Sequence, residues 1–283
     1  MKKQILSLVL CLCMLMSILP ASVLAKTDDT ISLDISEGSI TIENGTDEDT
    51  FKLTQGSIIV DNIDPLTTFA VSGTTTSNSV TVKANLIKDG IPLPVKITLN
   101  GVNIDVSGTY NDSAFKITSA AGAVNLTLAD GSTNTLKSAP SCAGLDKSST
   151  GESSVLTISG TGTLNAFGGK YCAGIGGGGV TRGTEYITIN GGSINATGGL
   201  QGAGIGGDSN GSASYIIING GTVTANGFDS AGIGGGYWGS ASNIFINGGT
   251  VTAIGGNYSA GIGGGYSGAG SYITVGGGTV NAV

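Results

Sequence analysis

A repeated cassette of about 29 residues fills the second half of the chain and limits what it can fold into. The cassette is clearest at 231–253, AGIGGGYWGSASNIFINGGTVTA, and it recurs from Ala173, Ala203 and Ala260. The Ala-Gly-Leu/Ile triplet that opens it recurs at steps of 28 to 30 residues, with a first copy at Ala143. A constant step of this size is typical of proteins that stack one supersecondary unit on the next. We therefore expect a solenoid.

Each cassette contains three short apolar segments in which every second residue is apolar. Ile216 and Ile218 share one face of their segment, and Val223 and Ala225 share a face opposite two threonines. The chain also contains 51 glycines, which disfavour helix. Three strands per coil, joined by glycine-rich corners, predict an all-β parallel β-helix (β-solenoid) with like positions about 4.8 Å apart on successive coils.

The chain divides into three predicted parts. Residues 1–25 have a basic start, an apolar run and small residues up to Ala25, which predicts a secretory signal peptide and a secreted or cell-surface protein. Residues 26–95 alternate like strands at irregular spacing and are interpreted as an N-terminal cap with irregular first coils. Residues 96–283 are predicted to be the β-helix repeat domain of about seven regular coils, without a C-terminal cap. We expect that open end to contact another chain end to end or a downstream domain, and we expect no membrane span.

One strand of each cassette, of the type ITIN, defines the predicted register. Its starts form one expected ladder: Ile97, Leu126, Leu156, Ile187, Ile216, Ile244 and Ile273. The residues that follow these strands form a second: Asn100, Ala129, Ser159, Asn190, Asn219, Asn247 and Gly276. Asn tolerates left-handed backbone, and its amide can bond to the amide one coil away. We interpret this second ladder as support for a turn.

The charged residues argue against catalysis and against nucleic-acid binding. The chain lacks His and has a net charge of −7, which excludes Ser-His-Asp and Cys-His nucleophiles and disfavours nucleic acid as a partner. From Tyr171 onward the only charged residues are Arg182, Glu185, Asp208 and Asp229, and no two acids hold matching positions. Cleavage of a polysaccharide needs paired carboxylates or a basic residue that takes a proton. The sequence therefore predicts a protein that is not an enzyme, with a polysaccharide lyase kept as an alternative.

Two cysteines hold the same position in neighbouring cassettes. Cys142 and Cys172 are therefore predicted to lie on adjacent coils. Export permits a disulfide, but parallel neighbours hold their Cβ atoms about 4.8 Å apart, wider than a disulfide favours. A bridged pair and two free thiols both remain open.

Aromatic residues recur at matching positions and provide the candidate binding surface. One set of tyrosines directly precedes the ITIN strand, and Asn243 holds this position in the coil that lacks a tyrosine there. A second set lies at the preceding corner, beside the only Trp. Flat rings along a rigid rod suit stacking against sugar rings. The glycan-binding candidates are Tyr186, Tyr215, Tyr237, Trp238, Tyr266 and Tyr272. In the alternative interpretation these rings only cover sheet edges and corners, and the regular Thr and Asn array on another face leaves ice binding as a further alternative.

An acidic segment near the N-terminus is the only candidate metal site. Asp47, Glu48 and Asp49, together with Asp61 and Asp64, offer oxygen ligands of the kind that Ca²⁺ takes. The spacing is not that of an EF-hand, and a solvated run of charge in the cap is the favoured interpretation. Calcium is therefore the one candidate cofactor.

The cassette GTVTAxGGxxxAGIGGGxxxxxxxITINGGTVTA, with ITLNGVNIDV and LTISGTGTLNAFGG upstream, resembles the Gly-rich β-helix surface proteins of Gram-positive bacteria. The resemblance covers about residues 31–283. It implies a right-handed parallel β-helix that binds carbohydrate, such as cellulose or acidic plant polysaccharide, in some cases with bound calcium. We therefore predict a secreted or cell-surface β-helix that binds polysaccharide non-catalytically through its aromatic and Thr/Asn ladders. The alternative is a structural or adhesin rod without a specific glycan ligand.

Overall fold

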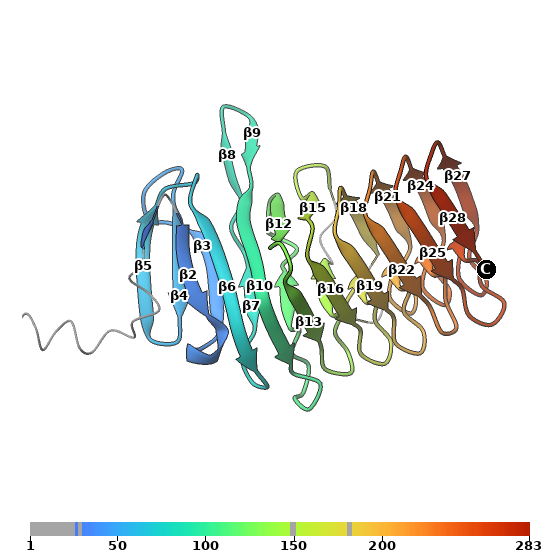
Figure 1. Ribbon diagram of the computed structural model, residues 1–283, viewed down its shortest axis with the longest axis horizontal. Helices are drawn as coiled ribbons and strands as arrows, with labels where there is room; N and C mark the ends of the chain where they lie inside the picture. The colour runs from blue at the N-terminus through green and yellow to red at the C-terminus, as the bar shows by residue number, and fades with distance from the viewer. Residues whose placement is uncertain (1–25, 28–29, 148–150, 180–182) are drawn as a thin grey trace, which may run out of the picture.

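The computed structural model describes residues 26–27, 30–147, 151–179 and 183–283. The predicted leader, 1–25, and Arg182 lie outside the described residues. The described chain is a stack of β-coils, and its one helical element is the three-residue 3-10 turn η2 (Ile35–Glu37) (Figure 1). Within the described residues, no helix is both long and apolar enough to cross a membrane.

Three parallel stacks of strands run along the rod (Figure 1). The first stack contains part of β10 (Val95–Asp105), β12 (Val124–Leu128), β15 (Leu156–Gly160), β18 (Thr184–Ile189), β21 (Ala213–Ile218), β24 (Ala241–Ile246) and β27 (Gly270–Val275). The second contains the rest of β10, β13 (Thr133–Lys137), β16 (Thr163–Phe167), β19 (Ser193–Thr197), β22 (Thr222–Asn226), β25 (Thr250–Ile254) and β28 (Thr279–Ala282). The third contains β7 (Val80–Val82), β11 (Phe115–Ile117), β14 (Leu145–Lys147), β17 (Ile175–Gly176), β20 (Ile205–Gly206), β23 (Ile233–Gly234) and β26 (Ile262–Gly263). The prediction of a parallel β-solenoid with three strands per coil and about seven coils is confirmed.

Long strands and antiparallel strands occur at the N-terminal end. Strand β6 (Thr68–Thr75) pairs with β10 around the corner between the first two stacks, and β2 (Thr30–Asp34) pairs with β6 in parallel and with β1 (Lys26–Thr27) antiparallel. Strands β3 (Ile40–Asn44), β4 (Phe51–Gln55) and β5 (Ile58–Ile63) form an antiparallel meander at the end of the third stack. A hairpin of β8 (Leu86–Lys88) and β9 (Ile91–Leu93) projects from the rod (Figure 1). Parallel pairing of coils therefore begins upstream of residue 96.

The predicted strand register is wrong at one step. Ile97 pairs with Leu126 as expected, but Leu126 pairs with Ile158, while Leu156 pairs with Val124. The register therefore differs by two residues between the second and third regular coils. A shift of two keeps the same side chains facing inward, so the alternating pattern could not detect it.

The shift also changes the predicted Asn ladder. Asn100 and Ala129 lie outside it, because Thr127 is the residue that pairs with Ser159. The later rungs are confirmed by amide hydrogen bonds: the Asn219 side chain donates to Asn190 at 2.8 Å, and Asn247 donates to Asn219 at 2.9 Å.

The last described coil, β27 and β28, forms the end of the sheet order. Val275 of β27 is 54% exposed, and Ile273 is also exposed. The predicted end-to-end or downstream contact at this surface stays a prediction.

Candidate functional site

A row of tyrosines follows the first stack, at the residue of each strand where the pairing with its neighbours is interrupted. The paired residues skip Tyr186 and Tyr215, because Glu185 pairs with Ser214 and Ile187 pairs with Ile216. The same skip recurs from β21 to β24 and on to β27. We call this row the tyrosine ladder; it consists of Tyr186, Tyr215, Asn243 and Tyr272. The register is the same on both sides of the skip, so no residue is inserted, and the pairing is interrupted at one residue of each strand.

The rings of the tyrosine ladder lie on the outside of the rod. Tyr186 and Tyr215 stack face to face, with ring centroids 4.7 Å apart and planes 4° from parallel. Tyr215 is 40% exposed and Tyr272 is 78% exposed. The structure therefore brings the three predicted tyrosines into one register on the surface.

The backbone of the tyrosine ladder is unfavourable for tyrosine. All four rungs have positive φ: 58° at Tyr186, 53° at Tyr215, 52° at Asn243 and 50° at Tyr272. Left-handed backbone costs an L-residue about 1–2 kcal/mol, whereas Asn and Gly adopt it more readily. Three surface tyrosines, the half-buried Tyr186 and the exposed Tyr215 and Tyr272, thus occupy a position where a smaller residue is more stable. Such strain tends to collect at functional sites.

A second group of rings, the aromatic corner, consists of Tyr237, Trp238, Tyr258 and Tyr266. Tyr237 and Tyr266 stack with centroids 4.9 Å apart, and Trp238 contacts both of them edge to face at 5.0 and 5.4 Å. Tyr258 adds an edge contact to Tyr266 at 5.8 Å. Trp238 and Tyr258 are exposed.

Tyr258 did not emerge from the sequence, because it follows β25, at a different corner from Tyr266. The two corners meet because β26, between them, is only two residues long. The short third-stack strands of the array were the sequence signal from which the contact between Tyr258 and Tyr266 could have been predicted.

A groove lies along the outer surface of β18, β21, β24 and β27, next to the tyrosine ladder. Its volume is about 620 Å³. We call it the serine groove, and its polar lining consists of Glu185, Asn210, Ser212, Ser214, Ser240, Ser242 and Ser271. Glu185 is the first rung of a ladder that continues through Ser214, Ser242 and Ser271. The repeated Ser-Ala-Ser at 212–214 and 240–242 is a sequence signal for this groove, and the prediction from aromatic positions did not include it.

The Glu185 carboxylate is held in place at one end of the serine groove. One of its oxygens accepts a hydrogen bond from the Ser214 hydroxyl at 3.2 Å, and the other accepts one from the Gly151 N–H at 3.3 Å. Behind it, the Lys147 ammonium donates to the Glu185 backbone carbonyl at 2.9 Å. Burial lowers the pKa of Lys147 to about 8, against the opposing effect of the Glu185 charge. Lys147 is only 1% exposed, so Glu185 rather than Lys147 faces the groove.

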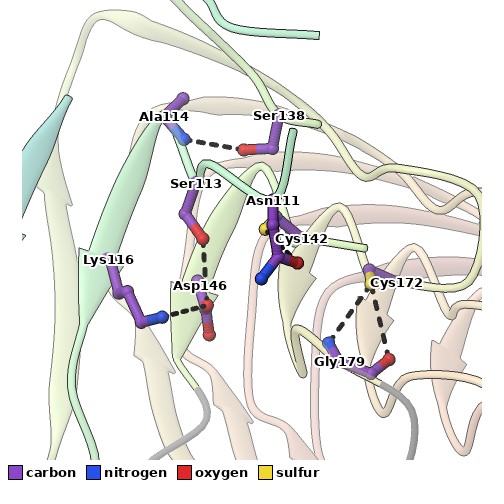
Figure 2. A network of polar contacts seen from close by, with 9 residues as sticks. All are labelled: Asn111, Ser113, Ala114, Lys116, Ser138, Cys142, Asp146, Cys172 and Gly179. Carbon is purple, nitrogen blue, oxygen red and sulfur yellow. Dashed lines mark hydrogen bonds and ion pairs between the residues drawn. The ribbon is translucent and has the colours of Figure 1, made fainter. Parts of the chain in front are cut away.

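The two predicted neighbouring cysteines lie in a buried polar region that Figure 2 shows. Both are free thiols. The Cys172 sulfur accepts from the Gly179 N–H at 3.3 Å, and burial raises the pKa of Cys172 to about 12. Burial also raises the pKa of Cys142. These thiols are protonated at neutral pH, which does not suit a nucleophile.

Acidic residues near the cysteines are equally enclosed. Asp146 is 2% exposed; it accepts a hydrogen bond from Ser113 at 3.1 Å and lies 4.0 Å from the Lys116 ammonium (Figure 2). Asp208 is fully buried. Neither carboxylate can therefore reach a polymer on the surface.

The acidic segment at Asp47, Glu48 and Asp49 follows β3 in the N-terminal meander. Asp49 pairs with Lys88 at 3.4 Å. Hydrogen bonds from Thr46 and Asn62 hold the pKa of nearby Asp61 below its usual value. Among the described residues, no group of three or more His, Cys, Asp or Glu side chains could hold a metal ion. Calcium binding here stays a prediction.

Comparison with known proteins divides the chain into two parts. Residues 55–181 match the model of a family described as carbohydrate-binding domain-containing protein. Residues 187–211, 216–237 and 246–266 match the beta helix repeat. No curated protein and no solved structure matches the chain. The chain is thus similar to a carbohydrate-binding domain-containing family over residues 55–181 and to β-helix repeats over ranges that include Tyr237 and Tyr266 of the predicted rings.

Proposed function

We propose that the protein is a secreted or cell-surface β-helix that binds polysaccharide without cleaving it, through the tyrosine ladder and the aromatic corner. The observation that carries the proposal is the positive φ of three surface tyrosines, of which Tyr215 and Tyr272 are exposed. Backbone preference disfavours a ring at these positions, and a surface that contacts sugar rings would favour one. The family similarity of residues 55–181 supports carbohydrate as the ligand class.

The charged residues support binding rather than cleavage. Hydrolysis needs two carboxylates on either side of the scissile bond. Asp208 is buried, and Glu185 faces the groove with its oxygens engaged by Ser214 and Gly151. We therefore expect incubation with pectin, cellulose or xylan to release neither reducing ends nor unsaturated products. Turnover that is lost in Glu185→Gln would contradict this part of the proposal.

Retention on insoluble plant, fungal and bacterial polysaccharides tests the proposal. The native protein is compared with Trp238→Ala and Tyr215→Ala, at low salt and with calcium present. A stacked ring contributes about 1 kcal/mol, so each substitution is expected to weaken binding about fivefold. Tyr110→Ala is the control, because Tyr110 is 95% exposed and lies in the other part of the chain.

The outcomes separate binding from a purely structural role. Retention that falls with Trp238→Ala or Tyr215→Ala but not with Tyr110→Ala supports the proposal. A loss with Tyr110→Ala alone places the binding surface in residues 55–181 instead. A protein that is retained on none of the polysaccharides is better described as a structural or adhesin rod.

A further inference from the structure

The serine groove crosses four successive coils and therefore has the direction of the rod. Its lining comes from β18, from β21 with the turn before it, from β24 and from β27. Neighbouring strands lie about 4.8 Å apart, so the four coils span about 14 Å along the rod. A groove of this length is longer than one sugar ring and open to an extended chain.

The lining of the groove offers hydroxyl groups at regular intervals. The Ser212 hydroxyl accepts a hydrogen bond from the Ser240 N–H at 3.1 Å, and the Ser240 hydroxyl accepts one from the Ala269 N–H at 3.1 Å. Each accepted bond orients a hydroxyl, which keeps a proton of its own to donate. The groove thus holds oriented hydroxyls on its two middle coils, at Ser212 and Ser240.

Aromatic residues stand next to the groove serines in the sequence. Ser214 directly precedes Tyr215, and Ser271 directly precedes Tyr272, so the tyrosine ladder runs beside the serine ladder. In the turn before β24, Trp238 lies two residues before Ser240 in the sequence. A chain of sugar rings along the groove would place hydroxyls against serines and ring faces near aromatic side chains.

Glu185 gives the groove its charge preference. Among the described lining residues it carries the only charge. Its carboxylate has about four lone-pair positions, and the bonds from Ser214 and Gly151 use two of them. The remaining positions can accept hydrogen bonds from sugar hydroxyls, whereas a sugar carboxylate would be repelled.

We propose that the serine groove holds an internal stretch of an uncharged linear polysaccharide, aligned with the rod, and that Glu185 disfavours acidic sugars. This inference rests on the proposed carbohydrate binding and adds the site, the direction of the chain and the charge class of the ligand.

Calorimetry with soluble oligosaccharides tests the inference. The probes are cello-, xylo- and manno-oligosaccharides of one to six rings, and oligogalacturonates of the same lengths. We expect affinity for at least one uncharged series to rise tenfold or more between one and four rings and then level off. Oligogalacturonates are expected to bind at least tenfold more weakly than uncharged probes of equal length.

Two variants address the groove directly. Ser242→Leu fills its middle and is expected to weaken binding of the four-ring probe at least tenfold. Thr41→Leu, a control at an outward-facing position of β3 outside the Thr/Asn array, is expected to leave it unchanged. Glu185→Gln is expected to reduce the preference for uncharged over acidic probes. Because Lys147 lies beside Glu185, thermal unfolding of this variant is followed in parallel, and Ser242→Leu tests the groove independently of that contact.

The failure of this inference is distinguishable from that of the proposed function. Binding that is weakened by Trp238→Ala but not by Ser242→Leu, or that is equal for one and four rings, overturns the groove while carbohydrate binding stands. Equal binding of acidic and uncharged probes by the native protein overturns the role of Glu185. If no glycan binds at all, the proposed function fails and this inference fails with it.

Discussion

Aromatic rings are buried in the core at the N-terminal end of the rod and lie on the surface in the coils from β18 onward. At the N-terminal end, Phe51, Phe69 and Phe115 are fully buried, and the rings of Phe51 and Phe69 lie 6.2 Å apart. In the coils from β18 onward, the core contains only Ile, Val and Ala, and the rings of Tyr215 and Trp238 are exposed. The same residue class therefore fills the core at one end and covers the surface at the other.

The difference accompanies a change in the third stack. From β17 onward the third-stack strands are two residues long and end in glycine, so successive backbones approach closely there. The core of these coils contains aliphatic side chains, and the rings of Tyr215 and Trp238 lie outside it. A ring on the surface contributes little to the core, which is why we relate the exposed tyrosines to ligand binding.

Glycine substitutions should give the largest difference between the two regions. A Cβ at Gly206, where φ is 144°, would lie 1.9 Å from the Gly234 carbonyl oxygen on the next coil. We expect Gly206→Ala to lower the free energy of unfolding by about 4 kcal/mol or more, measured by urea denaturation. Gly90, in the β8–β9 hairpin, has φ of 79° and open space around it, so Gly90→Ala should cost about 1 kcal/mol. Equal costs at both sites would show that the coils of the array are not closely packed.

Phenylalanine substitutions test the opposite placement of rings. Phe69→Ala removes a buried ring that packs against Phe51 and should cost about 3–4 kcal/mol in urea denaturation. Phe228, in the array, is 59% exposed, so Phe228→Ala should change stability by less than about 0.5 kcal/mol. A similar loss in both variants would remove the contrast between the two ends.

The pH dependence of stability tests the coil at which the two regions meet. Lys147 of β14 has a pKa of about 8 in the folded chain and 10.5 as its ordinary value. Between these values the unfolded chain binds more protons, so the free energy of unfolding should rise with pH, by about 3 kcal/mol at pH 10.5.

Lys147→Met should lack this rise in the free energy of unfolding. Urea denaturation of the native protein and the variant from pH 7 to 10 therefore measures the contribution of Lys147 as the difference between the two. The control is needed because Cys172 has the opposite effect: its pKa is raised to about 12, so stability falls as unfolded thiols ionise above pH 9. A difference that is constant with pH would contradict the burial of the Lys147 ammonium.

Alternation and spacing were enough to predict the parallel coils, the three strands per coil and the alignment of Tyr186 with Tyr215. These features depend on periods of two and of about 29 residues, and both periods can be recognised directly in the sequence. The pairing of Leu126 with Ile158 was not predictable, because a two-residue shift leaves the inward face unchanged. The contact of Tyr258 with Tyr266 depends on two corners meeting across a short strand.

The candidate site was predicted only in its outline. The aromatic rungs follow from the repeat, but their positive φ does not, because tyrosine is an unusual residue for left-handed backbone. The position of Glu185 at the head of a serine ladder depends on register within the strand rather than on residue type. The contact between Lys147 and Glu185 joins residues 38 apart and has no sequence signature.

The tyrosine ladder offers the smallest change in stability and the sharpest test of why rings lie outside. Tyr215→Asn replaces a strained residue with one that tolerates positive φ, as Asn243 already does in the next coil. The relief of about 1 kcal/mol is offset by loss of the stack with Tyr186, so stability should change by less than about 1 kcal/mol. Polysaccharide binding should nevertheless fall about fivefold, as calorimetry or retention would measure.

Asn243→Tyr is the converse change, because it adds a ring between Tyr215 and Tyr272 and makes the ladder continuous. Left-handed backbone should cost this variant about 1 kcal/mol of stability, while binding should strengthen. If the rings serve ligand binding, this variant should therefore be less stable than the native protein but bind polysaccharide more tightly. If Tyr215→Asn leaves binding intact and Asn243→Tyr adds none, the rings only cover the sheet edge, and the contrast between the two ends of the rod does not depend on a ligand.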